Sequence, residues 1–321
     1  MNYIVLDLEW NQTPNGKGTE KKGIPFEIIE IGAVKLNERL EITGRFSELI
    51  RPQIYRKMHR VTRDILNIDI EDLKECRTFP KVANSFLKWC GTNYRFCTWS
   101  SMDLTELQRN LKYYKTNPGW KIPFYYYDLQ KIYNIQFEED RNMKSLEAAV
   151  EKLGISKNLP FHRAGEDAEY TTRIMKKLDF KLINDNVSVD YFMTPKNRRE
   201  EILTIYKDHS EFVSKEYDLK ETAVSDKKLR STPCFLCKRT THKKIHWFAT
   251  NSGTYFCMAE CPQHGLLYGK LKIKHTDEGK FFGIKTISPA TEEDRKEMQE
   301  RKALLAKKRK EHKQRAESAQ E

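Results

Sequence analysis

A short apolar strand pattern that ends in two acidic residues most constrains how this chain can fold. Residues 3–10, YIVLDLEW, are apolar except for Asp7 and Glu9. On a β-strand, residues i and i+2 point to the same face, so the two carboxylates lie side by side. Adjacent carboxylates repel each other unless a cation lies between them, and Mg²⁺ prefers oxygen ligands. Taken alone, the pair predicts either a cation site at a strand end or two surface acids where a strand leaves the core.

Two later segments place further acids and a histidine at the starts of helices. Residues 94–99 have the pattern of a strand, and the helix that follows contains Asp103 in its first turn. Residues 161–168, FHRAGEDA, lead into an amphipathic helix, with Asp167 in its first turn and His162 in the loop before it. Individually, Asp103 could serve its own helix dipole and His162 could be an ordinary loop residue. Their common place at strand ends and helix starts indicates one shared site.

The motifs DLEW, WSSMD and HRAGEDA together resemble the three exonuclease motifs of the DnaQ-like, or DEDDh, superfamily of 3′–5′ exonucleases. The resemblance extends to residues 27–34 (EIIEIGAV) and 59–62 (HRVT), and it spans about residues 1–180. The lead-in at residues 144–146 (KSL) and the surroundings of Trp99 are most similar to the Eri-1/KapD-type branch, whose studied members act on RNA. The resemblance implies a ribonuclease H-like α/β fold with a mixed central sheet.

The resemblance also implies a catalytic site. Four carboxylates would hold two divalent ions, Mg²⁺ or Mn²⁺: Asp7, Glu9, Asp103 and Asp167. In this arrangement one ion would activate a water for in-line attack on the terminal phosphodiester, and the other would stabilise the charge on the leaving 3′ oxygen. His162 would accept the proton of that water, because an imidazole changes charge near neutral pH.

We therefore expect a metal-dependent 3′–5′ exonuclease whose partner is nucleic acid, with RNA favoured over DNA. Two alternatives stay open. One is a DNA exonuclease of the proofreading or repair type. The other is a nucleic-acid-binding adaptor with an inactive nuclease domain.

Hydrophobic periodicity predicts strands that alternate with helices in a first domain over residues 1–180. Strands are expected at about 3–9, 26–37, 40–51 and 93–99, and helices at about 78–90, 103–115, 125–132, 143–153 and 166–178. Antiparallel strands followed by alternating helices and strands favour an α/β fold with a mixed sheet. The segment 11–23 contains Gly and Pro without the spacing of a phosphate-binding loop, so we expect a flexible loop or a flap over the substrate.

Four of the seven cysteines lie close together after residue 230. They form a CxxC and a CxxxC pair, with nineteen residues between the pairs: Cys234 and Cys237, then Cys257 and Cys261. Two such pairs suit one structural, tetrahedral Zn²⁺, with His264 as an alternative ligand in place of Cys261. A disulfide is the other interpretation, which a cytosolic setting disfavours. A hairpin predicted between the pairs, with its turn at residues 251–253, makes the segment zinc-ribbon-like.

Basic charge is concentrated around these cysteines. Residues 227–285 carry 12 Lys and Arg against 3 Asp and Glu, in a chain whose net charge is +12. A basic module that also contains aromatic residues suits phosphate contacts and base stacking, and a merely solvated surface is the alternative. We expect residues 181–226 to form a helical connector and linker, residues 227–290 the zinc-binding module, and residues 291–321 a charged helical or disordered tail.

The chain has no apolar run near 18 residues, and acidic residues appear by position 7. We therefore expect no membrane segment and no signal peptide, and a cytoplasmic protein.

Overall fold

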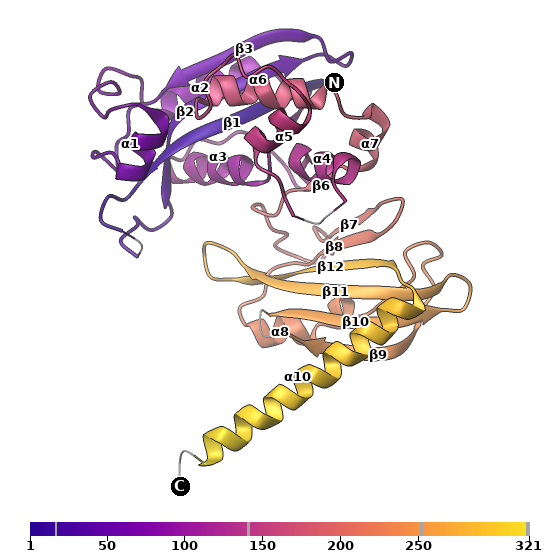
Figure 1. Ribbon diagram of the computed structural model, residues 1–321. Coiled ribbons are helices and arrows are strands. Elements are labelled where there is room, and N and C mark those ends of the chain that lie inside the picture. The colour runs from indigo at the N-terminus through magenta and orange to yellow at the C-terminus, as the bar shows by residue number, and fades with distance from the viewer. Residues whose placement is uncertain (17, 140–141, 251–252, 319–321) are drawn as a thin grey trace. The chain divides into compact units, whose positions relative to one another are not determined.

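The structure, a computed structural model, describes residues 1–16, 18–139, 142–250 and 253–318 (Figure 1). The chain divides into two compact units, Met1–Phe192 and Met193–Glu321. Each unit is built on a six-stranded sheet of its own. Within the described ranges, no helix combines the length and the apolar character needed to cross a membrane.

The sheet of the first unit has the order β3-β2-β1-β4-β5-β6. In this sheet β1 pairs antiparallel with β2 and parallel with β4, and β4 pairs parallel with β5. The mixed sheet expected from the sequence is therefore confirmed. Its strands are β1 (Asn2–Gln12), β2 (Phe26–Leu36), β3 (Ile42–Leu49), β4 (Tyr94–Thr98), β5 (Tyr125–Asp128) and β6 (Ser188–Val189).

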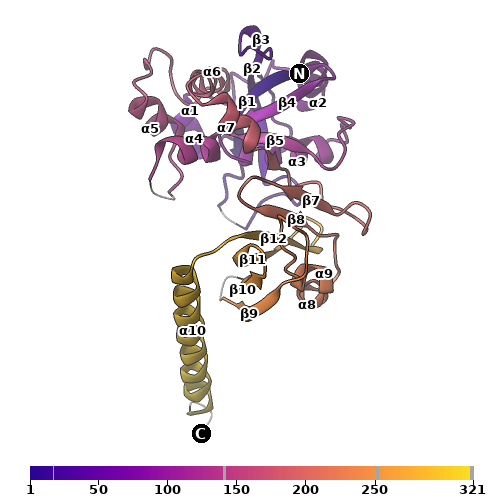
Figure 2. The ribbon, with the colours of Figure 1, turned by 90° about the vertical axis from the view of Figure 1, so that its right-hand side faces the viewer.

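Helices cover both faces of this sheet, because successive residues of β1 point to opposite sides. Val5 packs in one apolar core with Tyr133 and Ile174, whereas Leu6 packs in another with Phe86 and Leu107. Figure 2 shows α4 and α6 on one side of the sheet and α2 and α3 on the other. The helices of this unit are α1 (Arg60–Leu66), α2 (Phe79–Cys90), α3 (Met102–Tyr113), α4 (Leu129–Phe137), α5 (Leu146–Lys152), α6 (Ala164–Met175) and α7 (Phe180–Asp185).

One predicted helix of the first unit is wrong. The segment 125–132 divides into strand β5 and the first turn of α4. The break lies at Asp128, whose side chain accepts a hydrogen bond from the backbone amide of Lys131 and so caps α4. The three tyrosines before Asp128 favour a strand, and they pair with the ends of β4 and β6.

The second unit is an antiparallel sheet with the order β7-β8-β12-β11-β10-β9. Its strands are β7 (Ile202–Ile205), β8 (Ser210–Val213), β9 (His242–Ala249), β10 (Thr254–Cys261), β11 (Gly265–His275) and β12 (Phe281–Pro289). Two short helices and a long one complete it: α8 (Lys220–Ser225), α9 (Lys227–Arg230) and α10 (Glu292–Ser318). Figure 1 shows α10 extending beyond the sheet toward the C-terminus.

The helical connector predicted over residues 181–226 is wrong in its central part. Residues 202–213 form the β7–β8 hairpin, and β8 pairs with β12, so this segment belongs to the second sheet. The β-branched residues of ILTI favour a strand once a partner edge is present. The hairpin expected between the cysteine pairs is β9–β10, although residues 251 and 252 of its turn lie outside the described residues. The tail forms α10, and Met298 is its one buried side chain in the described part.

Candidate active site and metal centre

The five residues predicted to be catalytic come from one strand, two helices and one loop of the first unit. Asp7 and Glu9 lie on β1, Asp103 lies in the first turn of α3, and Asp167 lies in the first turn of α6, with His162 in the loop before it. Because β4 runs parallel to β1, the helix that follows β4 starts beside the carboxyl end of β1. The carboxyl ends of parallel strands are where α/β sheets place their sites.

Three of these residues have possible metal-ligand atoms that lie close to one another. Ligand atoms of Glu9, His162 and Asp167 are all within 4.8 Å of each other. The backbone amide of His162 donates a hydrogen bond of 3.0 Å to Oδ2 of Asp167, which ties the loop to the helix. His162 adopts the left-handed conformation, with φ 63°, and such backbones in non-glycine residues cluster at functional sites. Asp7 and Asp103 lie outside this group of three.

The charges of all four carboxyl groups nevertheless interact with one another. Burial raises the pKa of Asp7 well above its ordinary value, and the charges of Asp103, Asp167 and Glu9 add to the effect. Burial and the same cluster of charges raise the pKa of Glu9 to about 8. Burial also raises the pKa values of Asp103 and Asp167, each to about 7. Four carboxyl groups held this close favour protons or cations over their free ionised forms.

A buried carboxylate oxygen without a hydrogen-bond partner is one sign that the site suits a cation. Oδ1 of Asp167 is buried, and among the described residues no group hydrogen-bonds to it. Buried carboxylate oxygens almost always have a partner, so an orphaned one points to an absent ion or water. Hard divalent cations take carboxylate oxygens as ligands, and the residues present therefore fit such cations.

Glu30, which is buried, and Arg163, which is partly exposed, form an ion pair beside this cluster that the sequence analysis did not identify. Glu30 is fully buried on β2 and lies directly opposite Glu9 in the β1–β2 register, next to an irregularity between Glu9 and Trp10. Opposed like charges destabilise a sheet, but the Arg163 guanidinium binds both oxygens of Glu30, at 3.1 and 3.0 Å. Because Arg163 adjoins His162, this bidentate pair fixes the start of α6 against β2.

Gly32 allows the start of α6 to lie close to the backbone of β2. It lies opposite Asp7 in the register, and a Cβ at this position would lie 1.9 to 2.1 Å from backbone atoms of Ala164 and Gly165. An isolated glycine within a strand is a known sign of close backbone approach. That signal was present in the sequence, but it does not say which element approaches.

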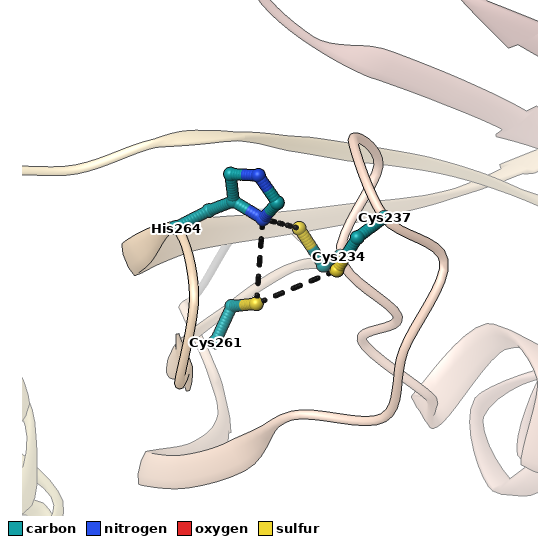
Figure 3. A group of neighbouring side chains, drawn as sticks. All are labelled: Cys234, Cys237, Cys261 and His264. Atoms are coloured by element: carbon teal, nitrogen blue, oxygen red, sulfur yellow. Dashed lines mark hydrogen bonds between the residues drawn. The ribbon is translucent and has the colours of Figure 1, made fainter.

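The second unit holds a separate cluster of three cysteines and a histidine (Figure 3). Ligand atoms of Cys234, Cys237, Cys261 and His264 all lie within 4.8 Å of one another. Nδ1 of His264 is 3.5 Å from Sγ of Cys234 and 3.6 Å from Sγ of Cys261, and Sγ of Cys237 is 3.6 Å from Sγ of Cys261. Cys234 and Cys237 lie in a tight turn closed by hydrogen bonds between Cys234 and residues 238 and 239.

Cys257 was predicted to belong to this cluster, and the structure contradicts this. Cys257 and Cys261 both lie on β10, and four residues of strand separate their positions by about 13 Å. Cys257 packs instead with Trp247, Leu229 and Leu271 in an apolar core, where burial raises its thiol pKa to about 12. His264 replaces Cys257, not Cys261 as the sequence suggested.

Comparison with known proteins bears on the first unit. The model of the exonuclease family RNase_T matches residues 4–175, more than half of the chain. The chain belongs to this exonuclease family. The resemblance to the DEDDh superfamily seen in the motifs is thereby confirmed.

Individual relatives of this exonuclease are distant. Human 3′-5′ exoribonuclease 1 is 25% identical over 163 residues, which are 47% of this chain and 46% of the relative, so the chain spans about half the length of that protein. The nuclease domain of 3′hExo, a DEDDh family member bound to rAMP, has 21% identity and a TM-score of 0.49, covering 60% of this chain and 97% of that one. Cell-death related nuclease 4 has 19% identity and a TM-score of 0.46, covering 64% and 68%.

Proposed function

We propose that this chain is a metal-dependent 3′–5′ exonuclease that hydrolyses phosphodiester bonds from the 3′ end of nucleic acid, with RNA as its preferred substrate. The observation that carries the proposal is the acidic cluster of Asp7, Glu9, Asp103 and Asp167 with His162 at its side. The preference for RNA is supported by the human relative, which is named an exoribonuclease.

The chemistry needs a base, a cation site and a fixed geometry between them. When bound by the four carboxylates, divalent ions would activate a water and stabilise the leaving 3′ oxygen. His162 is exposed, and its ring lies within 4.8 Å of the carboxylates of Glu9 and Asp167, so its imidazole can take the proton of that water. The hydrogen bond from its backbone amide to Asp167 holds the loop, and the Glu30–Arg163 pair holds the helix that carries Asp167.

The test uses 5′-labelled RNA and DNA of the same sequence, each with Mg²⁺ and without divalent ions. We expect a ladder of shortened RNA that keeps its 5′ label, which appears only with Mg²⁺ and is lost in an Asp7→Asn variant. Faster shortening of the DNA would favour the proofreading or repair alternative. No hydrolysis of either polymer by a chain that binds both would favour the inactive adaptor.

We also propose that the cluster in the second unit binds one structural Zn²⁺ through Cys234, Cys237, Cys261 and His264. Tetrahedral zinc with bonds of about 2.3 Å to sulfur and 2.0–2.1 Å to nitrogen holds its ligand atoms about 3.6 to 3.8 Å apart. The separations of 3.5 to 3.6 Å here agree with that geometry. The ion would join the Cys234–Cys237 turn to the β10–β11 connection.

Metal analysis of the full chain tests the zinc proposal without reference to activity. We expect one zinc per chain, its loss in Cys237→Ser and in His264→Ala, and its retention in Cys257→Ala as the matched control. Full zinc in His264→Ala together with loss in Cys257→Ala would show that the ligand set is the one predicted from the sequence.

A further inference from the structure

The loop that carries His162 has little backbone structure of its own. It joins α5 to α6, and most of its residues from 156 to 162 are exposed. Within the described part of the chain, residues 156–162 form no hydrogen bond with another backbone group. Pro160 contributes to this, because proline has no N–H to donate. The position of the loop therefore depends on its contacts with side chains.

Those contacts come from three residues of α6. Asp167, Tyr170 and Arg173 follow one another at intervals of three, so each lies beside the next on the helix surface. The hydrogen bond to Asp167 described above holds the end of the loop. The guanidinium of Arg173 donates to the backbone oxygen of Ser156 at 3.3 Å and to Oδ1 of Asn158 at 2.7 Å. Arg173 thereby ties the start of the loop to the helix.

Tyr170 holds the middle of the loop. Its hydroxyl accepts a hydrogen bond of 2.9 Å from the backbone amide of Leu159 and donates one of 2.7 Å to the backbone oxygen of the same residue. A hydroxyl offers one donor and two acceptor positions, so this single group satisfies both polar backbone groups of Leu159. The ring of Tyr170 stacks on that of Phe161, with centroids 4.6 Å apart and planes at 14°. Phe161 directly precedes His162, so this contact reaches the neighbour of the proposed base.

Tyr170 is itself fixed in the core of the first unit. It is fully buried and packs in the same apolar core as Tyr133 and Ile174. Leu159 and Phe161 are partly buried against that core. Side chains in a close-packed core have locked rotamers and can therefore support a residue that must keep its place. Through Tyr170, the loop is attached to the rigid part of the unit.

We propose that Tyr170 and Arg173 are positioning residues, which hold the loop so that the His162 imidazole stays beside the acidic cluster. A general base must lie within hydrogen-bond reach of the proton that it takes. The left-handed backbone of His162, with φ 63°, is one that surrounding contacts have to maintain. This inference rests on the proposed exonuclease function, to which it adds two residues that act through His162 and not on the substrate.

A purely structural role is the competing interpretation, because a buried tyrosine with two hydrogen bonds also stabilises the fold. The two interpretations differ in one consequence. A positioning residue affects the rate only while His162 is present, whereas a loss of stability affects the rate with or without that base. Residues that act as a unit have effects that do not add, so single and double variants separate the two interpretations.

The test measures kcat and KM for hydrolysis of a five-nucleotide RNA at saturating Mg²⁺. Four full-length chains are compared: the unmodified chain, Tyr170→Phe, His162→Ala and the double variant. Tyr170→Phe removes the hydroxyl and keeps the stacked ring. The matched control is Tyr133→Phe, because Tyr133 is fully buried in the same core and its hydroxyl bonds Glu138, which is not part of the loop.

We expect Tyr170→Phe to lower kcat by about 10–100-fold and to change KM by less than about twofold, because a small displacement of a catalytic group acts on the chemical step. Tyr133→Phe should keep both constants. In the His162→Ala background, Tyr170→Phe should change kcat by less than about twofold. An equal loss with and without His162, an unchanged kcat, or a rise in KM alone would each overturn the proposal.

A second variant covers the case in which Tyr170→Phe does not fold. The side chain of Arg173 is 27% exposed, so Arg173→Gln disturbs the core less while it frees the start of the loop. It should lower kcat in the chain that has His162 and leave kcat unchanged in His162→Ala. The same loss in both backgrounds would overturn the proposal.

Two further results distinguish this inference from the exonuclease proposal. An unmodified chain that hydrolyses neither RNA nor DNA with Mg²⁺ would overturn the exonuclease function, whereas additive effects in an active chain would overturn only the positioning role. Hydrogen exchange measures the hold on the loop without reference to activity. A peptide that covers residues 156–162 should exchange faster in Tyr170→Phe than in Tyr133→Phe, and equal exchange would show that the hydroxyl does not hold the loop.

Discussion

Replacing Gly32 by alanine tests whether close contact between β2 and α6 shapes the acidic site. The added Cβ would lie 1.9 Å from the backbone carbon of Ala164, whereas real Cβ contacts below 3.0 Å essentially never occur. The atoms that obstruct it belong to the backbone and cannot rotate away as a side chain would. The start of α6 must therefore move from β2 by at least about 1 Å.

Both stability and activity should respond to that movement. Overpacking a core usually costs 1–3 kcal/mol, and we expect about 3 kcal/mol because backbone has to shift. For a unit of this size, that corresponds to a fall in melting temperature of about 6–12 °C. The displaced turn carries Asp167 and follows His162, and a misplacement of about 1 Å at a catalytic group costs on the order of 10²-fold in rate.

The assay combines thermal unfolding with hydrolysis of a five-nucleotide RNA at saturating Mg²⁺. Gly44→Ala is the matched control, because a Cβ on Gly44 would meet only the ring of Trp89, at an ordinary 3.4 Å. We expect Gly44→Ala to melt within about 2 °C of the parent and to keep its rate. A Gly32→Ala chain with the melting temperature and rate of Gly44→Ala would refute the reasoning.

Further predictions concern protons at the acidic site. In buffer without divalent ions the pKa values of Glu9, about 8, and of Asp103 and Asp167, about 7, lie above those of carboxyl groups in an unfolded chain, about 4. The folded state then binds more protons than the unfolded state, so the melting temperature of the chain should fall as pH rises from 5 to 8. In an Asp103→Asn variant the fall should be smaller. A melting temperature that rises with pH over this range would contradict the raised pKa values. His162→Ala should lower the hydrolysis rate by about 10²–10⁴-fold with little effect on metal binding, and an unchanged rate would exclude a role as general base.

The sequence predicted the positions of the candidate site residues best where the pattern of neighbouring residues determines the secondary structure around them. Asp7 and Glu9 alternate on one strand, and Asp103 and Asp167 each open a helix, so their positions at element ends follow from nearby residues alone. The mixed sheet followed from the same spacing of strands and helices. The contacts of each residue were harder to predict from the sequence, because Glu30 and Gly32 acquire their roles only through the pairing of β1 with β2 and the docking of α6.

The errors have the same origin. Cys257 and Cys261 look like a metal-binding pair by spacing, but the spacing suits one ion only if the residues lie on a turn, and here both lie on β10. Residues 202–213 lie in a segment of mixed charge and weak periodicity that was predicted to be a helical connector, but pairing of β7 with β8 and of β8 with β12 makes them a hairpin. In both cases pairing into a sheet decided the local structure: β8 pairs with β12, which is distant in the sequence, and β10 pairs with its neighbours β9 and β11.

The acidic site joins segments that leave the ribosome far apart in time. Asp7 and Glu9 lie on the first strand, whereas His162 and Asp167 follow about 160 residues later, and the α6 turn that carries Asp167 docks against β2 through Gly32. A growing chain that has not yet released α6 therefore lacks Asp167 of the acidic cluster and His162, the proposed base. Such a nascent chain therefore holds an incomplete acidic cluster until nearly all of the first unit has emerged and folded.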